Sequence, residues 1–144
     1  MENSLFEQSH HCSIQNVMSA YCRFVDTKNW RELQALFVEN PRMTFRDADG
    51  KLLFDFDNTV PFVRSADEAI GKAVTLHQLH NPEINLLNDT EAKGVWAMED
   101  RFYLSHNATQ PFFHGAGYYH VRFTFFADRW RISELLLLRL WLSA

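Results

Sequence analysis

The feature that most constrains the fold is an alternation between two sets of side chains, one apolar and one more polar, over residues 118–125. Successive side chains of a β-strand point to opposite faces of its sheet, so this period of two predicts a strand with one apolar and one wetter face. An apolar face of this kind must be covered, and we expect helices to cover it. The predicted inner face carries Tyr119, Val121, Phe123 and Phe125, and the predicted outer face carries Tyr118, His120, Arg122 and Thr124.

Further strand patterns lie mainly in the second half of the chain. Turn residues at Asn88-Asp89 and Asp128-Arg129 separate neighbouring segments and favour antiparallel pairing through short connections. Residues 105–111 are polar and rich in turn formers, which is typical of a loop at the rim of a sheet. The predicted strands span residues 43–45, 52–56, 83–87, 91–104, 118–126 and 130–142.

The first half of the chain instead repeats apolar residues at helical spacing. The clearest repeat predicts a helix from about Ser13 to Val25, preceded by a flexible tail over residues 1–12. Cys12 and Cys22 are ten residues apart on or beside this helix, roughly 15 Å at a rise of about 1.5 Å per residue, which is too far for a disulfide. We therefore expect two reduced thiols, which are typical of a cytoplasmic protein.

Capping signals predict two more helices. Asn29 is a candidate N-cap with Glu32 as its capping-box partner, and an apolar stripe continues from there to Phe37 before Pro41 ends the helix. A second capping box, Ser65-Ala-Asp-Glu68, predicts the start of a third helix that leads into the sheet. Helices in the first part of the chain and a long antiparallel sheet in the last part make an α+β domain.

Composition supports a single domain over all 144 residues. Apolar residues make up 47% of the chain and charged residues only 22%, which excludes a disordered or fibrous protein. The formal net charge is -4 and no long run of Lys or Arg occurs, so we expect no nucleic-acid partner. The sequence has no secretory signal pattern and no apolar run long enough to cross a bilayer, so we expect no membrane association.

Several short motifs, taken in their order and spacing, resemble the SnoaL-like branch of the nuclear transport factor 2-like superfamily. The resemblance implies a cone-shaped fold in which three N-terminal helices pack on a strongly curved mixed, mainly antiparallel sheet. It also implies a deep pocket at one end of the cone and a homodimer formed through the sheet. The motifs are Tyr21-Cys-Arg-Phe-Val-Asp26 before Asn29-Trp30, Thr75-Leu-His77 before Asn81-Pro-Glu-Ile84, Gly117-Tyr-Tyr119, and Trp130-Arg-Ile132.

Asp26 and His77 form the leading chemical hypothesis. Asp26 falls at the carboxyl end of the first predicted helix, where the helix dipole disfavours a carboxylate, so it needs a partner. In dehydratase and dehydrochlorinase members of the family, the resemblance implies a dyad at these two positions: the carboxylate orients the imidazole, and the imidazole removes a proton from carbon. The alternative is structural, with Asp26 as a local cap of the second helix and His77 as a hydrogen-bonded strand residue.

Further residues are candidate parts of the pocket. Tyr21 lies on the apolar stripe of the first helix and would direct its hydroxyl at a substrate carbonyl, or else pack in the core with its hydroxyl at the edge. Tyr119 matches a pocket-lining aromatic residue of the family. Trp96 and Met98 are candidate substrate-binding residues on a strand that also carries Asp100, and strand parity leaves open which face of that strand is inside.

One position departs from the pattern that the resemblance implies. Dehydrochlorinase-like and bile-acid dehydratase-like relatives place an arginine in the pocket a few residues after the Trp-Arg-Ile motif, and the matching residue here is Leu135. We therefore expect an apolar wall at Leu135 and an uncharged substrate. Arg139 has the same strand parity four residues later, so it would either supply a cation nearer the mouth or form an ordinary salt bridge.

The histidine spacing does not suggest a metal site, and we expect no organic cofactor. His77 and His80 are three residues apart, so on a strand they face opposite sides, and no third ligand is spaced to complete a metal site.

Together these features predict a small cofactor-independent lyase or isomerase, of the dehydratase or cyclase kind, that acts on an apolar substrate, for example a polycyclic one. His77 would be the base, Asp26 its orienting carboxylate and Tyr21 the hydrogen-bond donor to the substrate. The alternative is a non-catalytic module that binds a ligand or supports another chain, as a β subunit does, because one fold serves many functions.

Overall fold

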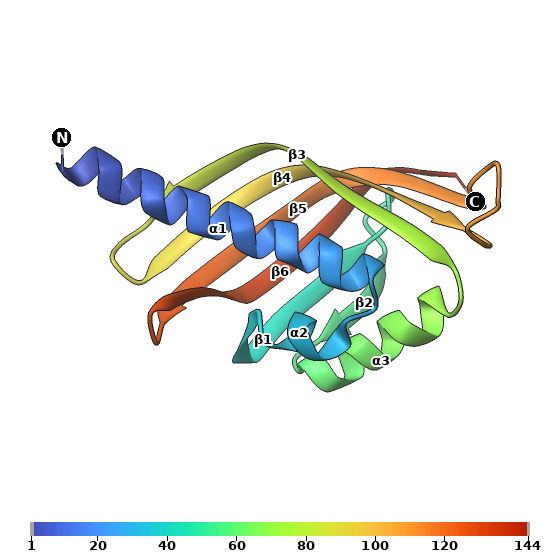
Figure 1. Cartoon of the computed structure of the whole chain (residues 1–144), viewed down its shortest axis with the longest axis horizontal. Helices are drawn as coiled ribbons and strands as arrows, with labels where there is room; N and C mark the ends of the chain where they lie inside the picture. The colour runs from blue at the N-terminus through green and yellow to red at the C-terminus, as the bar shows by residue number, and fades with distance from the viewer. Residues whose placement is uncertain (1, 144) are drawn as a thin grey trace.

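The computed structural model describes residues 2–143, which form three helices and one six-stranded sheet (Figure 1). The helices are α1 (Glu2–Asp26), α2 (Trp30–Gln34) and α3 (Thr59–Ile70). The strands are β1 (Phe37–Arg46), β2 (Leu52–Phe56), β3 (Val74–Leu86), β4 (Glu91–Tyr103), β5 (Phe113–Phe126) and β6 (Arg129–Ser143).

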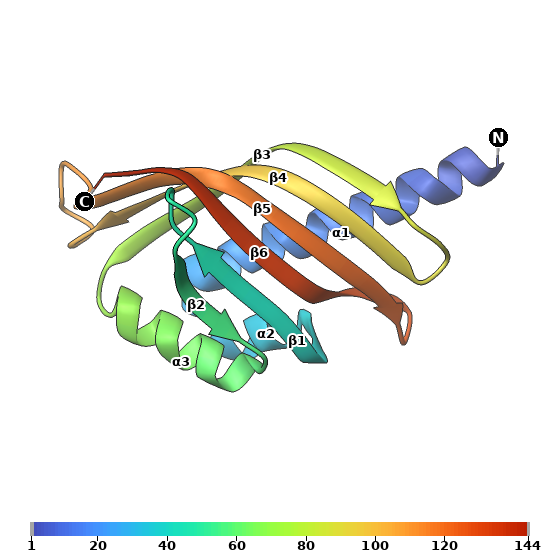
Figure 2. The same cartoon turned by 180° about the vertical axis from the view of Figure 1, so that it is seen from behind.

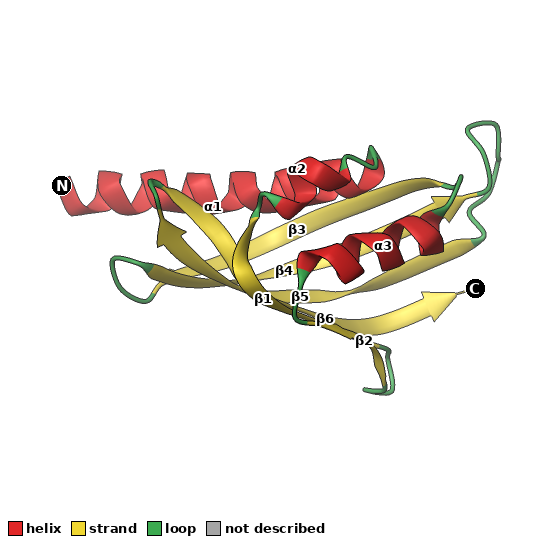
Figure 3. Cartoon of the chain, turned by 90° about the horizontal axis from the view of Figure 1, so that it is seen from below, coloured by secondary structure: helices red, strands yellow, loops and turns green. Residues whose placement is uncertain are grey.

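The sheet is mixed but mainly antiparallel. Its strands follow the order β2-β1-β6-β5-β4-β3, and every neighbouring pair is antiparallel except β1 and β6. Figures 1 and 2 show α1 lying along one face of the curved sheet, and Figure 3 shows the sheet bending around the helices. The predicted α+β fold, with helices packed on a curved mixed sheet, is confirmed.

The core lies between α1 and the inner face of the sheet. Tyr119 and Phe123 on β5 are 2% and 1% exposed, whereas Tyr118 on the opposite face is 41% exposed. The alternation along this strand therefore assigns its two faces correctly. From α1, Ile14 and Met18 join the same cluster and are fully buried. Each buried side chain of this size contributes about 1.5–3 kcal/mol to folding.

The first helix is longer than its sequence pattern predicts. α1 begins at Glu2 and not at Ser13, so the segment expected to be a flexible tail continues the helix. His10 on this extension accepts a hydrogen bond from Trp130 Nε1 at 2.9 Å, and its ring meets Phe125 and Trp130 edge-on. The apolar repeat does not predict these turns, because the residue that holds them on the sheet is a histidine and the repeat is defined by hydrophobic residues only.

The caps and bounds of the two shorter helices differ from those that the capping signals predict. Asn29 precedes α2, but its side chain makes no capping hydrogen bond, and the apolar stripe passes into β1 at Phe37. α3 is capped by Asn58, whose side chain accepts a hydrogen bond from the Val60 N–H at 2.8 Å. Ser65 therefore lies inside α3 and does not start it. An earlier residue with the same capping chemistry takes over the role that the Ser65 motif predicts.

The third helix ends at Ile70, and the strand that follows it carries His77. α3 ends before Gly71, whose positive φ of 55° lets the chain turn away from the helix, and β3 starts at Val74. Asn81 has φ 49°, and the pairing of β3 with β4 shifts register there, so β3 is irregular at this point. The part of β3 before Asn81 runs beside the end of α1 and carries His77.

Two smaller expectations concern cysteines and membranes. Cys12 is exposed, Cys22 is buried, and both are free thiols. Within residues 2–143, none of the helices has the length and apolar character needed to cross a membrane.

The contact between His10 and Trp130 should hold the first turns of α1 on the sheet. Trp130 is 4% exposed, so His10→Ala would leave its buried N–H without this acceptor, at a cost of about 1–3 kcal/mol in the free energy of unfolding. We expect faster amide hydrogen exchange over residues 2–12 and a lower urea midpoint. His11→Ala removes the neighbouring imidazole outside this contact, and equal effects of the two substitutions would contradict the assignment.

Candidate active site

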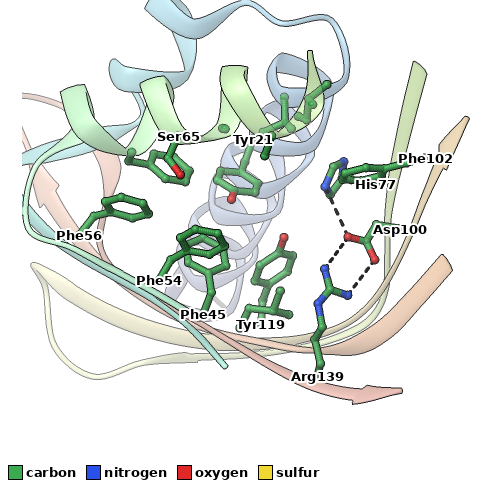
Figure 4. Close-up of a pocket in the computed structure, with 16 residues that line it drawn as sticks. Tyr21, Phe45, Phe54, Phe56, Ser65, His77, Asp100, Phe102, Tyr119 and Arg139 are labelled. Carbon is green, nitrogen blue, oxygen red and sulfur yellow. Dashed lines mark hydrogen bonds and ion pairs between the residues drawn. The ribbon is translucent and has the colours of Figure 1, made fainter. Parts of the chain in front are cut away.

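A pocket of about 140 Å³ lies between α3, the β1–β2 hairpin and the inner face of the sheet (Figure 4). Its lining has a polar end and an apolar end. The side chains at the polar end come from α1, β3, β4, β5 and β6, so only the folded chain brings them together. They are Tyr21, His77, Asp100, Tyr119 and Arg139.

Asp26 is the last residue of α1 and fastens this helix to β3. Its Oδ1 accepts a hydrogen bond from Thr75 Oγ1 at 2.9 Å, and its Oδ2 accepts one from the His77 backbone N–H at 2.9 Å. These donors offset the unfavourable position of a carboxylate at the negative end of the helix dipole. Asp26 therefore acts across the tertiary structure and is not a local cap of α2.

The same carboxylate orients the His77 imidazole. His77 Nδ1 lies 2.7 Å from Asp26 Oδ1, and because a carboxylate only accepts, Nδ1 carries a proton and donates it. In the neutral ring the lone pair is then on Nε2. This nitrogen faces the pocket, 3.8 Å from Asp100 Oδ2. The structure thus brings the two predicted residues together and directs the basic nitrogen at the cavity.

Asp26 and His77 also border a second hollow, of about 380 Å³, between α1 and β3. The pair therefore stands between the inner pocket and this outer hollow. The Asp26 side chain is 19% exposed and that of His77 is 9% exposed. Water reaches the carboxylate side of the pair, while the Nε2 side faces the inner pocket.

Asp100 and Arg139 form a buried ion pair beside His77. Arg139 Nη1 and Nη2 donate to Asp100 Oδ1 and Oδ2 at 3.0 and 2.8 Å, and the side chains of Arg139 and Asp100 are 10% and 2% exposed. Burial by itself would lower the pKa of Arg139, but the hydrogen bond and the negative charge of Asp100 outweigh it and raise that pKa above its usual value. Arg139 therefore stays charged, and both oxygens of Asp100 are engaged.

Gly115 makes room for this ion pair. It lies on β5 directly opposite Asp100 on β4. A Cβ at Gly115 would overlap Arg139 Nη1 and would come within 2.9 Å of Asp100 Oδ1. A residue with a side chain would shift the guanidinium from its present position, so glycine leaves room for this geometry of the pair.

Tyr21 and Tyr119 lie between the two ends of the pocket (Figure 4). Their rings meet edge to face with centroids 5.8 Å apart, and the residues are 3% and 2% exposed. Burial raises the pKa of both phenols well above the usual value, and a hydrogen bond with Tyr119 offsets part of this effect at Tyr21. Both hydroxyls therefore stay protonated at neutral pH. The Tyr119 hydroxyl donates to the Tyr21 oxygen, which leaves the Tyr21 hydroxyl to donate to a ligand.

Phenylalanine rings build the apolar end. Phe45 stacks on Phe62 with centroids 6.0 Å apart, and Phe54 stacks on Phe56, also at 6.0 Å. α3 supplies Phe62, and the β1–β2 hairpin supplies the other three rings. A ligand in this pocket would place an apolar group among the rings and a polar group near His77.

Three residues predicted to bind substrate lie outside the pocket lining. Trp96, Met98 and Leu135 are 3%, 2% and 0% exposed and belong to the closed hydrophobic core. All three are on the inner face of the sheet. They precede the pocket residues Asp100 and Arg139 on their strands, in a part of the sheet where core side chains fill the space.

The structure also decides two points that the sequence leaves open. Asp100 faces inward, and strand parity would find it once Trp96 and Met98 were known to be buried on the same strand. Arg139 forms a salt bridge, as one of the two alternatives predicts, but it does so inside the pocket. The expectation that an apolar wall replaces the pocket arginine is therefore wrong, because Arg139 enters from four residues beyond Leu135.

His80 does not share a site with His77. Its Nε2 lies 4.0 Å from Glu99 Oε1, and its side chain is 52% exposed. No three His, Cys, Asp or Glu side chains in the described part of the chain are grouped in a way that could hold a metal ion.

A family model described as the SnoaL-like domain matches residues 9–135. The chain belongs to the SnoaL-like family. The matched region contains Asp26, His77 and Asp100, and it ends four residues before Arg139. The cation of this SnoaL-like pocket therefore comes from a strand position beyond the family match.

Individual proteins resemble this SnoaL-like chain over most of its length. It is 24% identical over 136 residues to the probable cyclase FGR4 of Gibberella zeae, with 89% of each chain covered. The crystal structure of a putative scytalone dehydratase from Novosphingobium aromaticivorans superposes with a TM-score of 0.79 at 18% identity, covering 99% of this chain and 91% of that one. The β subunit of a putative aromatic-ring-hydroxylating dioxygenase from the same organism gives 0.78 at 12% identity, covering 93% and 91%. The two structures share the fold of this chain.

Removing one partner of the Asp100–Arg139 pair should destabilise the protein more than removing both. Asp100→Leu would leave a guanidinium that is only 10% exposed without its counter-charge, at a cost of about 3–5 kcal/mol in unfolding free energy. The double variant with Arg139→Met keeps the volume apolar and should recover most of this loss in urea unfolding.

An exposed ion pair provides the control for this measurement. Arg42 and Asp55 are 61% and 36% exposed at the side chain, so Arg42→Met should change stability little. A double variant at Asp100 and Arg139 that is as unstable as Asp100→Leu alone would contradict the argument.

Proposed function

We propose that this SnoaL-like protein is a lyase or isomerase that removes a proton from a carbon atom of a small apolar substrate. The observation that carries the proposal is the position of His77, with Nδ1 bound to Asp26 and Nε2 directed into a pocket with an apolar end. A base held in one tautomer and largely shielded from water is suited to proton abstraction from carbon.

The proposed reaction begins when His77 Nε2 takes a proton from the carbon next to a carbonyl group. The electron pair of the C–H bond moves toward the carbonyl oxygen, and the enolate accepts a hydrogen bond from the Tyr21 hydroxyl. In an isomerisation the proton then returns to a different carbon. In a dehydration a hydroxyl group on the β-carbon takes this proton and leaves as water. Between the two steps, Asp26 stabilises the imidazolium.

The relatives support a lyase-like activity. The family match includes both members of the Asp26–His77 pair, and the similar proteins include a probable cyclase and a putative scytalone dehydratase. The proposed steps use only side chains of this chain and call for no metal or organic cofactor.

A non-catalytic ligand-binding module or partner subunit is the second candidate. It is favoured by the likeness to a dioxygenase β subunit, with a TM-score of 0.78. In that case Asp26 and His77 would serve only to join α1 to β3. The two candidate functions differ in whether His77 Nε2 removes a proton from a substrate.

Deuterium exchange tests the proposed base before the natural substrate is known. In D₂O, the wild-type protein should exchange the α-protons of small cyclic and aryl ketones, measured by NMR. His77→Gln should slow this exchange by about 10²–10⁴-fold, because it removes the base. Asp26→Asn should also slow it, because the asparagine amide no longer favours the His77 tautomer with the proton on Nδ1 and the lone pair on Nε2. His120→Gln changes an exposed histidine on the outer face and should exchange at the wild-type rate.

The same experiment separates the two candidates. Exchange by folded His77→Gln at the wild-type rate would exclude His77 as the base. Absence of exchange by the wild type with every ketone would favour the ligand-binding or partner-subunit function.

We also propose that two copies associate through the outer faces of their sheets. Tyr118 is 41% exposed there, and Leu136 and Leu138 lie on the same face of β6. Arg122 and Glu134, 3.8 Å apart, border this apolar area. An apolar centre with a charged rim is typical of a protein interface.

Sedimentation analysis tests the dimer. Tyr118→Glu would bury a charge at the interface, so the sedimenting mass should fall from that of a dimer to that of a monomer. Leu104→Glu changes a residue of the β4–β5 loop that is 74% exposed, and should leave the mass unchanged. A wild-type monomer at high protein concentration would contradict the proposal.

We also propose that the protein is located in the cytoplasm. The free thiols Cys12 and Cys22 on α1 support it, because reduced cysteines are typical of reducing compartments.

A further inference from the structure

We propose that Phe54 limits the pocket to neutral substrates with one aromatic-sized ring. The inference rests on the proposed function, because it takes the pocket at His77 as the substrate site. It adds the substrate class and the residue that sets it.

The size of the pocket matches one ring. Its volume is about 140 Å³, and an apolar cavity of about 150 Å³ holds one benzene molecule. The apolar end is closed by tight aromatic contacts, since Phe56 lies 5.7 Å from Phe62 and 6.5 Å from Phe45 between ring centroids. A second fused ring would therefore require a wall of the pocket to move.

Phe54 is the wall that faces the mouth. Among the residues that line the pocket, only Phe54 and Ala69 are exposed, so the mouth lies between β2 and α3. Phe54 is 47% exposed, and its ring stacks on Phe56 at 6.0 Å and meets Phe45 edge-on at 6.3 Å. β2 is an edge strand that pairs with β1 alone in the described sheet. Phe54 thus covers the apolar end from the outside, on a short strand at the edge of the sheet.

The polar end favours a neutral head group. Both donors of the Arg139 fork that face Asp100 are engaged by its oxygens, so the charge of Arg139 is already balanced. His77 is flanked by Asp26 at 2.7 Å and Asp100 at 3.8 Å, so an anion at Nε2 would meet two carboxylates. A carbonyl oxygen avoids this repulsion and can accept a hydrogen bond from Tyr21.

Binding of three simple probes tests the inference. Acetophenone has one ring and a neutral carbonyl group, 2-acetonaphthone adds a fused ring, and benzoate replaces the carbonyl group by a carboxylate. By titration calorimetry or ligand-observed NMR, the wild type should bind acetophenone at least about tenfold more tightly than either other probe, a difference of about 1.4 kcal/mol. Phe54→Ala should raise the affinity for 2-acetonaphthone about tenfold and leave benzoate weak.

Leu53 supplies a matched control on the same strand. It is 42% exposed and does not line the pocket, so Leu53→Ala should keep the wild-type preference. Phe54→Val is a milder second variant in case Phe54→Ala does not fold, and it should shift the preference in the same direction.

Each outcome decides the inference. Equal affinity of the wild type for the two ketones, tight binding of benzoate, failure to bind acetophenone, or an unchanged preference in both folded Phe54 variants would overturn it. The expected preference without deuterium exchange by the wild type would support the size limit and count against the proposed catalysis. Exchange without the preference would leave the catalysis standing and overturn the size limit.

Discussion

The hydrogen bonds of Asp26 join the two parts of the molecule that form the site. α1 ends at this carboxylate, and β3 supplies its three donors, which are Thr75 Oγ1, the His77 N–H and His77 Nδ1. A carboxylate at a helix C-terminus is unfavourable on its own, so its position depends on these donors. They orient the His77 ring in turn. One contact therefore fixes both the packing of the helix on the sheet edge and the direction of the basic nitrogen.

The charges beyond His77 are balanced inside the protein. Asp100 lies 3.8 Å from Nε2 and binds Arg139 through both oxygens, in a space that exists because position 115 is glycine. A buried carboxylate without a partner would cost several kcal/mol, whereas this pair brings a nearly neutral polar surface to the pocket. This pairing explains how a largely apolar cavity can hold the carboxylate of Asp100 beside the imidazole of His77.

The two ends of the pocket are built on secondary-structure elements that differ in how firmly their neighbours hold them. The polar residues lie on α1 and on β3 to β6. Strands β4, β5 and β6 are paired on both sides, and the edge strand β3 is held to α1 by the hydrogen bonds of Asp26. Three of the four phenylalanines at the other end lie on the β1–β2 hairpin at the edge of the sheet. Catalysis requires side chains that are held in fixed positions. The wall of a pocket through which a ligand enters benefits from a position at the edge of the sheet, where the backbone can move. The proposed roles of His77 and Phe54 follow this division.

The sequence by itself determined the α+β class, the two faces of β5 and the stripe that Ile14 and Met18 bury, because backbone geometry sets these periods locally. It also named Asp26 and His77 through the order of short motifs. Only the tertiary structure decided that Asp100 pairs with Arg139, 39 residues away, and that Trp96, Met98 and Leu135 lie in the core and not in the pocket. It likewise decided that His10 anchors the first turns of α1 through Trp130. The reason is that periodicity tells which way a side chain points, whereas the curvature of the sheet and the placement of the helices decide what it meets there.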